Sequence, residues 1–142
     1  MTTLFSMTLD GAQAATVTGA FELADDNPES LLLQANFTYG SGGTTADAWV
    51  QTSLDSGATW IDIANFHFTT ASLRYLFNLS ALTPVTTEYA ATDGTLAANT
   101  AKDGIIGPFL RVKYVTTGTY AGSTTLRIDA TTRSGISAPY SG

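Results

Sequence analysis

The sequence has 142 residues, a length that fits one domain spanning 1–142. Charged residues make up 13% of it, about half of the ~25% usual for soluble domains. The net charge is −6 and the isoelectric point is about 4.3. Nucleic acids and anionic membranes both attract basic faces, so we expect neither as a partner. Because cysteine is absent, disulfides, thiolate nucleophiles and cysteine-ligated zinc sites are excluded.

The charges are unevenly distributed along the chain. No lysine or arginine precedes Arg74, whereas eight acidic residues do. The six basic residues are Arg74, Lys102, Arg111, Lys113, Arg127 and Arg133. The molecule could therefore carry two oppositely charged faces that orient subunits in an assembly, or the charges could pair within one sandwich. The sequence leaves both interpretations open.

Apolar residues alternate with polar ones over most of the chain, and threonine, valine, isoleucine and aromatic residues dominate these runs. This pattern is typical of half-buried β-strands. In chain order, we expect strands at 3–9, 15–23, 30–39, 46–54, 59–68, 73–80, 109–116 and 124–132. The fold class predicted is all-β: a single-domain antiparallel β-sandwich or jelly roll of about eight strands.

Glycine-containing turns separate these strands at Asp10-Gly11, Ser41-Gly42-Gly43, Asp55-Ser56-Gly57 and Gly118–Gly122, and we interpret all four as hairpins. In the last hairpin, Leu110, Val112 and Tyr114 would face Leu126 and Ile128. Arg111, Lys113 and Arg127 would then lie together on the outer side, and we expect them to form a contact patch. The segment 38–45 also resembles 119–125 in sequence.

Two segments lack strand periodicity. Residues 81–107 form a long loop with Pro84, Asp93-Gly94 and Asp103-Gly104, and we interpret it as an arm that reaches a neighbouring subunit. The tail 134–142 is rich in glycine, serine and proline, and we expect a partner to be needed to order it. The run Leu31-Leu32-Leu33 suggests a strand covered on both faces.

One local motif is distinctive. Residues 53–60 match the Asp-box pattern S-x-D-x-G-x-T-W, with its defining residues at Ser53, Asp55, Gly57, Thr59 and Trp60. Asp55 would accept hydrogen bonds from turn amides, Gly57 would supply the left-handed conformation, and Trp60 would pack beneath. This chemistry builds a hairpin and no active site, so we expect a structural role.

No constellation predicts an enzyme, a cofactor or a metal site. His67 is the only histidine, and no nucleophile motif accompanies it. The acidic residues single out no catalytic pair. Asp25-Asp26-Asn27 offers oxygen ligands for calcium, although an Asx-rich turn before Pro28 explains the same residues.

Several aromatic residues cluster in the central strands and could form either a core or a stacking platform for sugars. They are Trp49, Trp60, Phe66, Phe68, Tyr75 and Phe77. Alternation predicts that Trp60, Phe66 and Phe68 share one side of their strand. An aromatic surface on the outside would serve a subunit interface as well as a carbohydrate.

Residues 46–130 contain distinctive phrases, among them WVQTSLDSGATWIDIANFHFTTAS and NLSALTPVTTEYAATDGTLAANTAKDGIIGPFLRVKYV. This stretch resembles small virion structural proteins of tailed bacteriophages. The resemblance implies a capsid decoration (cement) protein, a β-rich subunit that binds outside the major capsid protein shell, often as a homotrimer. It implies no catalytic residues. We therefore expect a virion protein of the phage head exterior, made in the host cytoplasm.

Two alternatives remain open. A tail or head–tail connector protein would belong to the same structural class. A carbohydrate-binding β-sandwich would account for the aromatic residues and the Asp-box, and would bind sugar as a monomer.

Overall fold

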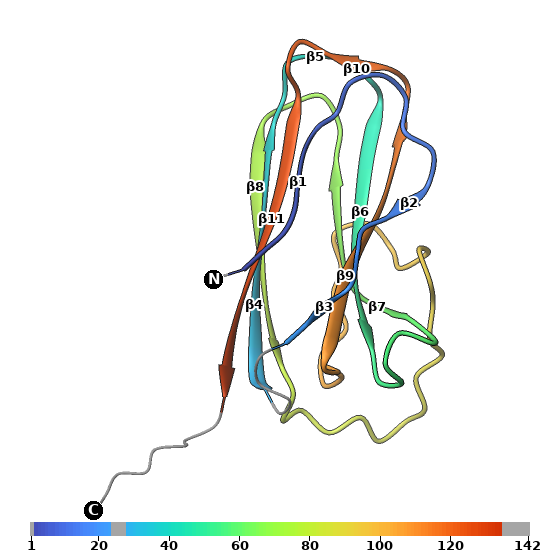
Figure 1. Ribbon diagram of the computed structural model, residues 1–142, viewed down its shortest axis with the longest axis vertical. Helices are drawn as coiled ribbons and strands as arrows, with labels where there is room; N and C mark the ends of the chain where they lie inside the picture. Colours follow the sequence, from blue (N-terminus) through green and yellow to red (C-terminus); the bar gives the residue numbers. More distant parts are fainter. Residues whose placement is uncertain (1, 24–27, 135–142) are drawn as a thin grey trace, which may run out of the picture.

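The computed structural model describes residues 2–23 and 28–134, which form strands, turns and loops without a helix. Two antiparallel sheets face each other, and a small third sheet lies at one end (Figure 1). The prediction of an all-β antiparallel sandwich is therefore confirmed. Over the described residues, no helix is long and apolar enough to cross a membrane.

The first sheet, called sheet I here, has four strands. In spatial order they are β1 (Thr2–Thr8), β11 (Thr125–Ser134), β4 (Pro28–Thr38) and β8 (Leu73–Ser80). Every neighbouring pair is antiparallel. The first and last strands of the described chain thus lie side by side in sheet I.

The opposing sheet, sheet II, contains β2 (Thr16–Val17), β3 (Phe21–Glu22), β9 (Phe109–Thr117), β6 (Thr45–Ser53) and β7 (Ile61–Phe68). Strands β2 and β3 both pair with the outer side of β9, so together they form one interrupted edge. The third sheet consists only of β5 (Ser41–Gly42) and β10 (Tyr120–Ala121).

All eight strands expected from the sequence are present, with small differences at their ends. The expected strand 15–23 is split into β2 and β3, and the two-residue strands β5 and β10 were not foreseen. Such short strands depend on pairing between distant segments, which leaves no periodic signal in a sequence.

Only one of the four expected hairpins is a hairpin. Asp55-Ser56-Gly57 joins the paired strands β6 and β7, whereas the other three turns carry the chain from one sheet to the other. The predicted pairing of the last two strands was wrong, since β9 pairs with β6 and β11 pairs with β4 and β1. Alternation identifies the buried side of a strand but not its neighbour.

The two similar segments noted in the sequence are the two crossings β4–β6 and β9–β11, and they pair with each other through β5 and β10. Tyr120 is fully buried there and donates a hydrogen bond from its hydroxyl to the Thr69 carbonyl at 2.7 Å. Burial raises the pKa of Tyr120. Gly43 has φ +68°, and a Cβ at this position would lie 2.3 Å from the Tyr120 ring. Glycine at position 43 therefore leaves room for the tyrosine.

The core lies between the sheets and is built from the inward residues of each strand. Leu110, Val112, Leu126 and Ile128 face one another across it, although their strands do not pair. Stacked rings add to it, as between Phe37 and Phe68 at 4.8 Å. The sequence suggested that the run Leu31-Leu32-Leu33 is covered on both faces. This suggestion was wrong, because Leu32 is exposed on the outer face of sheet I.

Candidate functional site

The most elaborate polar cluster surrounds Asp62, which is fully buried on the outer side of β7. The Asp62 carboxylate accepts hydrogen bonds from the backbone amides of Gly94, Thr95 and Leu96 at 2.8 to 3.1 Å. Side chains donate two more at 2.8 Å, from Thr92 Oγ1 and Gln51 Nε2. A buried carboxylate is tolerated when donors replace its water, as they do here.

A β-bulge brings Asp62 to this side. Val50 lies opposite Ala64 and Gln51 lies opposite Asp62, so Ile63 is the extra residue of β7. The bulge reverses the alternation, and Trp60 consequently lies on the outer side of sheet II, where the Arg111 guanidinium sits 4.4 Å from the Trp60 ring centre. The expectation that Trp60 shares a side with Phe66 and Phe68 was therefore wrong.

The loop 81–107 lies along the free edge of β7. Amides of β7 donate to the loop from Asp62 to the Thr92 carbonyl and from Asn65 to the Thr100 carbonyl, both at 2.8 Å. Asn99, at φ +53°, accepts a hydrogen bond from the His67 amide and donates one to the His67 carbonyl. The segment interpreted as an arm is thus folded onto its own sheet, where it covers an edge strand.

Gln51 connects the buried cluster to a charged one. Its Oε1 accepts from Arg111 Nε at 2.7 Å, and its Nε2 donates to Asp93 Oδ1 at 2.6 Å. Asp93 also pairs with Lys113 Nζ at 3.3 Å and with Arg111 at 3.6 Å. The hydrogen bond from Gln51, followed by the one from Lys113 and the two nearby positive charges, lowers the pKa of Asp93.

The expected contact patch is divided between the two sheets. Arg111 and Lys113 lie on the outer face of sheet II, where Asp93 pairs with both. Arg127 lies on the outer face of sheet I and pairs with Asp129 at 3.0 Å. The structure therefore does not bring the three cations together. Their partners, Asp93 and Asp129, lie in the second half of the sequence. The three cations therefore pair within the sandwich, but not with the described acidic residues of the first half of the sequence.

His67 takes part in a structural contact. Its Nδ1 lies 2.8 Å from Asp47 Oδ1, on the neighbouring strand β6. Asn65 Nδ2 donates to the same carboxylate oxygen at 3.4 Å. Among the described residues, no group of three or more histidine, aspartate or glutamate side chains is placed to hold a metal ion. The calcium alternative at Asp25-Asp26-Asn27 lies outside the described residues, as does the expected tail 134–142 apart from Ser134, which is the last residue of β11.

The Asp-box residues form a compact turn. Asp55 Oδ1 accepts from Ser53 Oγ and from the Thr59 amide, both at 2.8 Å, and Thr59 Oγ1 donates to Asp55 Oδ2 at 2.6 Å. Gly57 has φ +91°, and its amide donates to Ser53 Oγ at 2.8 Å. The two hydrogen bonds from Thr59, and then the one from Ser53, lower the pKa of Asp55 from 3.8 to about 2. Both carboxylate oxygens of Asp55 thus accept hydrogen bonds from residues of the same turn.

The aromatic residues considered as a sugar platform are dispersed. Phe66 and Phe68 are buried in the core, and Trp49 lies beneath the loop with its indole N–H bonded to the Leu96 carbonyl at 3.0 Å. Tyr75 and Phe77 on β8 are half-buried on the core side, where Tyr75 stacks on Phe68 and Phe77 packs at a tilt against Phe66. These six side chains do not form one exposed surface.

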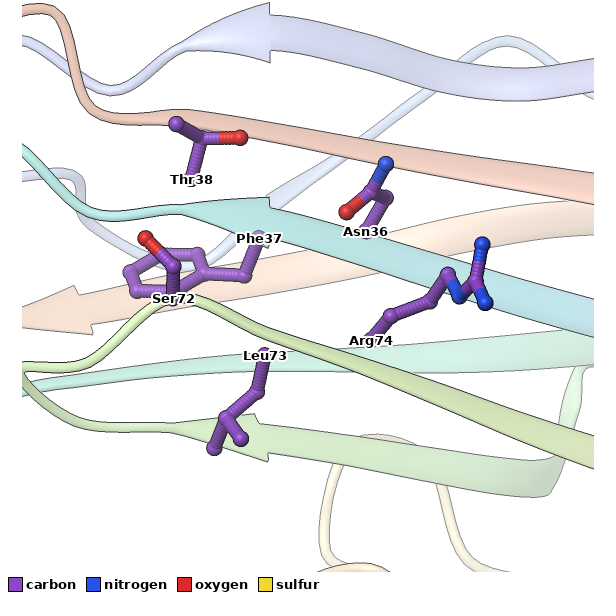
Figure 2. A pocket seen from close by; sticks show the side chains of 6 residues that line it. All are labelled: Asn36, Phe37, Thr38, Ser72, Leu73 and Arg74. Atoms are coloured by element: carbon purple, nitrogen blue, oxygen red, sulfur yellow. The ribbon is translucent and has the colours of Figure 1, made fainter.

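A shallow hollow of 330 Å³ lies where β4 ends and its neighbour β8 begins. It is lined by Asn36, Phe37, Thr38, Ser72, Leu73 and Arg74 (Figure 2). Asn36 and Arg74 are cross-strand neighbours, and Phe37 is buried. The lining contains one charged side chain and neither a histidine nor a carboxylate, so it offers no acid–base pair.

The outer face of sheet I has exposed leucines in its central rows and arginines in the two flanking rows, Arg127–Asn36–Arg74 and Arg133–Ser30–Ser80. Its central rows run across the strands as Asp129–Gln34–Leu76 and Thr131–Leu32–Asn78. Leu32 and Leu76 are exposed, and Asp129 is buried with its carboxylate bonded to Arg127 and Thr3. Amide, hydroxyl and leucine groups therefore dominate the central rows, which suits burial against another protein.

Comparison with known proteins gave no match: no family model, no curated protein and no solved structure is significantly similar to this chain.

Proposed function

We propose that this chain is a capsid decoration (cement) protein of a tailed bacteriophage. It binds the outside of the major capsid protein lattice as a homotrimer and stabilises the head, without catalysing a reaction. The phage resemblance of residues 46–130 suggests this role. Within the structure, the observation that carries the proposal is the centre of the outer face of sheet I, where Leu32 and Leu76 are exposed.

The physical logic is one of low desolvation cost. Removing water from hydroxyl and amide groups costs less free energy than removing it from charged groups, and burying exposed leucines is favourable. A subunit that binds only the assembled lattice stabilises that lattice by mass action. A trimer would multiply the modest contacts of each subunit into firm attachment.

The test is binding to capsids of the encoding phage that were assembled without this protein. Purified protein is mixed with such particles, the particles are pelleted, and bound copies per particle are counted by densitometry. Saturation at a whole multiple of the lattice sites supports decoration. Absence of binding at micromolar concentration would refute it and leave the tail or connector alternative.

Two variants locate the surface. Leu32→Glu places a charge at the centre of the outer face of sheet I and should weaken capsid binding at least tenfold. Leu54→Glu makes the same change at an exposed leucine in the turn between β6 and β7, outside that face, and should leave binding unchanged. Equal binding by both variants would show that a different surface contacts the capsid.

A further inference from the structure

The two sheets differ in how their edges are finished. The β7 edge of sheet II is covered by the loop 81–107, and its opposite edge consists of two two-residue strands, β2 and β3. Short or covered edges do not accept a further strand. Sheet II is therefore closed to strand addition at both sides.

Sheet I ends in two strands whose outer sides are free. Among the described residues, no hydrogen bond reaches the outer side of β1 over Thr2–Thr8 or of β8 over Leu73–Leu79. An edge strand directs the N–H and C=O groups of alternate residues away from its neighbour, so both edges present unpaired donors and acceptors.

Both edges carry little of the usual protection against pairing, which consists of charges, prolines and bulges. Strand β1 has no charged residue and no proline, and β8 has a single charge, Arg74. The register irregularity of β1 lies between Thr3 and Phe5, so the strand is regular from Phe5 to Thr8. On the core side, Met7 of β1 and Tyr75 and Phe77 of β8 are only partly buried. A strand added at either edge would cover them.

The strand directions specify which edge fits which. Strand β1 is antiparallel to β11, β11 to β4, and β4 to β8, so β1 and β8 run in opposite directions. If β8 of one copy lies beside β1 of another, the sheet continues in the antiparallel sense. We propose that β8 of each copy pairs with β1 of the next, joining copies of this chain head to tail through sheet I.

This contact pairs both free edges of every copy, whereas a two-fold contact between two β8 strands would leave β1 unpaired. Repeated head-to-tail contacts close into a ring when the rotation permits. The inference rests on the proposed function only for the ring size, three copies; the pairing of β8 with β1 is derived from the sheet edges alone.

Disulfide trapping tests the pairing, because the chain has no cysteine of its own. Ser6 and Asn78 are exposed residues of β1 and β8. Cross-strand neighbours lie about 4.5 to 5.5 Å apart between Cα atoms, within the range that a disulfide spans. Three double variants are made: Ser6→Cys/Asn78→Cys, and, for alternative registers, Thr8→Cys/Asn78→Cys and Ser6→Cys/Arg74→Cys. Each is oxidised at high micromolar concentration and analysed on non-reducing gels.

At least one double variant should form covalent trimers, and the single variants should remain monomeric on the gel. Cross-linked dimers from Asn78→Cys alone would show that two β8 strands pair, and monomers from all variants would show that the edges stay free; either outcome overturns the proposal. The experiment uses the free chain, so its failure leaves the capsid-binding result unaffected. A double-cysteine variant that also carries Leu32→Glu should still be trapped as trimers, even though Leu32→Glu no longer binds capsids.

Discussion

Asp62 has no exposed surface, yet five donor groups point at its carboxylate. Three of these donors are consecutive backbone amides of residues 94–96, so one side chain fixes the course of a loop about thirty residues further along the chain. Because hydrogen bonds to a buried charged group are strong and costly to lose, Asp62 is expected to be a principal anchor of the loop 81–107.

Asp62→Asn should lower the free energy of unfolding by roughly 3 kcal/mol, since the amide nitrogen would face donors that now bond to a carboxylate oxygen. Urea unfolding followed by fluorescence measures the change. Asp10→Asn is the control, because the exposed Asp10 side chain makes no hydrogen bond within the described part of the chain. Equal stability of the two variants would contradict the anchoring role.

Asp55 provides a pH-dependent contribution. Its pKa is about 2 in the folded protein against an ordinary value of 3.8. Its stabilising effect is therefore fully present above about pH 4 and is lost as the pH falls toward 2. In urea unfolding at stepped pH, Asp55→Asn should lose less stability than the wild type between those values. A wild-type slope in the variant would show that the Asp55 hydrogen bonds contribute nothing in solution.

At the residue scale, the sequence predicted Ser53, Asp55 and Gly57 well because all partners of the Asp-box turn lie within six residues. It did not predict Asp62, Gln51 or Asn99, whose partners lie 11 to 60 residues away. A signal was present, since Asp62 is a charged residue between Ile61 and Ile63 in an apolar strand. Nothing in the sequence, however, indicated which segment would satisfy it.

At the scale of elements, the loop 81–107 replaces a missing neighbouring strand. It bonds to β7 through the amides of Asp62, Asn65 and His67 without forming a strand of its own, apart from a bridge between Ala64 and Ala101. This arrangement protects an edge that would otherwise invite pairing. It also explains why so long a segment without periodicity belongs to a compact domain.

Asn99→Gly should open this edge locally. Glycine keeps the positive φ of position 99 but removes the side chain that bonds to both backbone groups of His67. The His67 amide should then exchange with solvent about fivefold faster, as expected for the loss of a bond worth about 1 kcal/mol. Amides shared between β6 and β9 should keep their rates. Unchanged exchange at His67 would show that the loop seals the edge without Asn99.

The crossing formed by β5 and β10 can be tested by a matched pair of glycine substitutions. Gly43→Ala introduces strain at φ +68° and a clash with the Tyr120 ring, whereas Gly11→Ala introduces similar strain at φ +85° with no atom within 4 Å. We expect about 1 kcal/mol of destabilisation for Gly11→Ala and roughly 2 to 4 kcal/mol for Gly43→Ala. Equal effects, measured by thermal unfolding, would mean that the tyrosine moves aside readily.

The sequence predicted the strands better than their pairing. Leu110, Val112, Leu126 and Ile128 were correctly placed in the core because alternation reports burial directly. Their strands were wrongly paired because a glycine-rich turn is compatible with both a hairpin and a crossing between sheets. The resemblance between segments 38–45 and 119–125 reflected two such crossings, which the sequence alone did not reveal.

At the scale of the whole molecule, most charged side chains lie away from the strand edges through which we propose that copies pair. The ion pairs of Arg111, Lys113 and Arg127 are internal, while β1 and β8 together carry only Arg74. Association through the edges of sheet I would depend on backbone hydrogen bonds and apolar burial. Two oppositely charged faces, the alternative raised by the sequence, would instead depend on Coulomb attraction.

Salt distinguishes these two kinds of contact. Raising the ionic strength from roughly 0.1 M to 1 M shortens the screening length from about 10 Å to about 3 Å. We expect the dissociation constant between copies, measured by sedimentation, to change less than threefold over this range. Weakening by tenfold or more would indicate that charged faces hold the copies together.

The pairing of β1 with β11 also governs when the protein can fold. Thr2 lies opposite Ala130 in sheet I, so β1 leaves the ribosome long before the strand with which it pairs. Strand β4 likewise gains its β11 neighbour only after β11 has been synthesised. Contacts of such long sequence separation form slowly, and the growing chain meanwhile exposes unpaired strands. Rapid synthesis of many copies at once would therefore favour entanglement between nascent chains, and slower expression at lower temperature should increase the soluble yield.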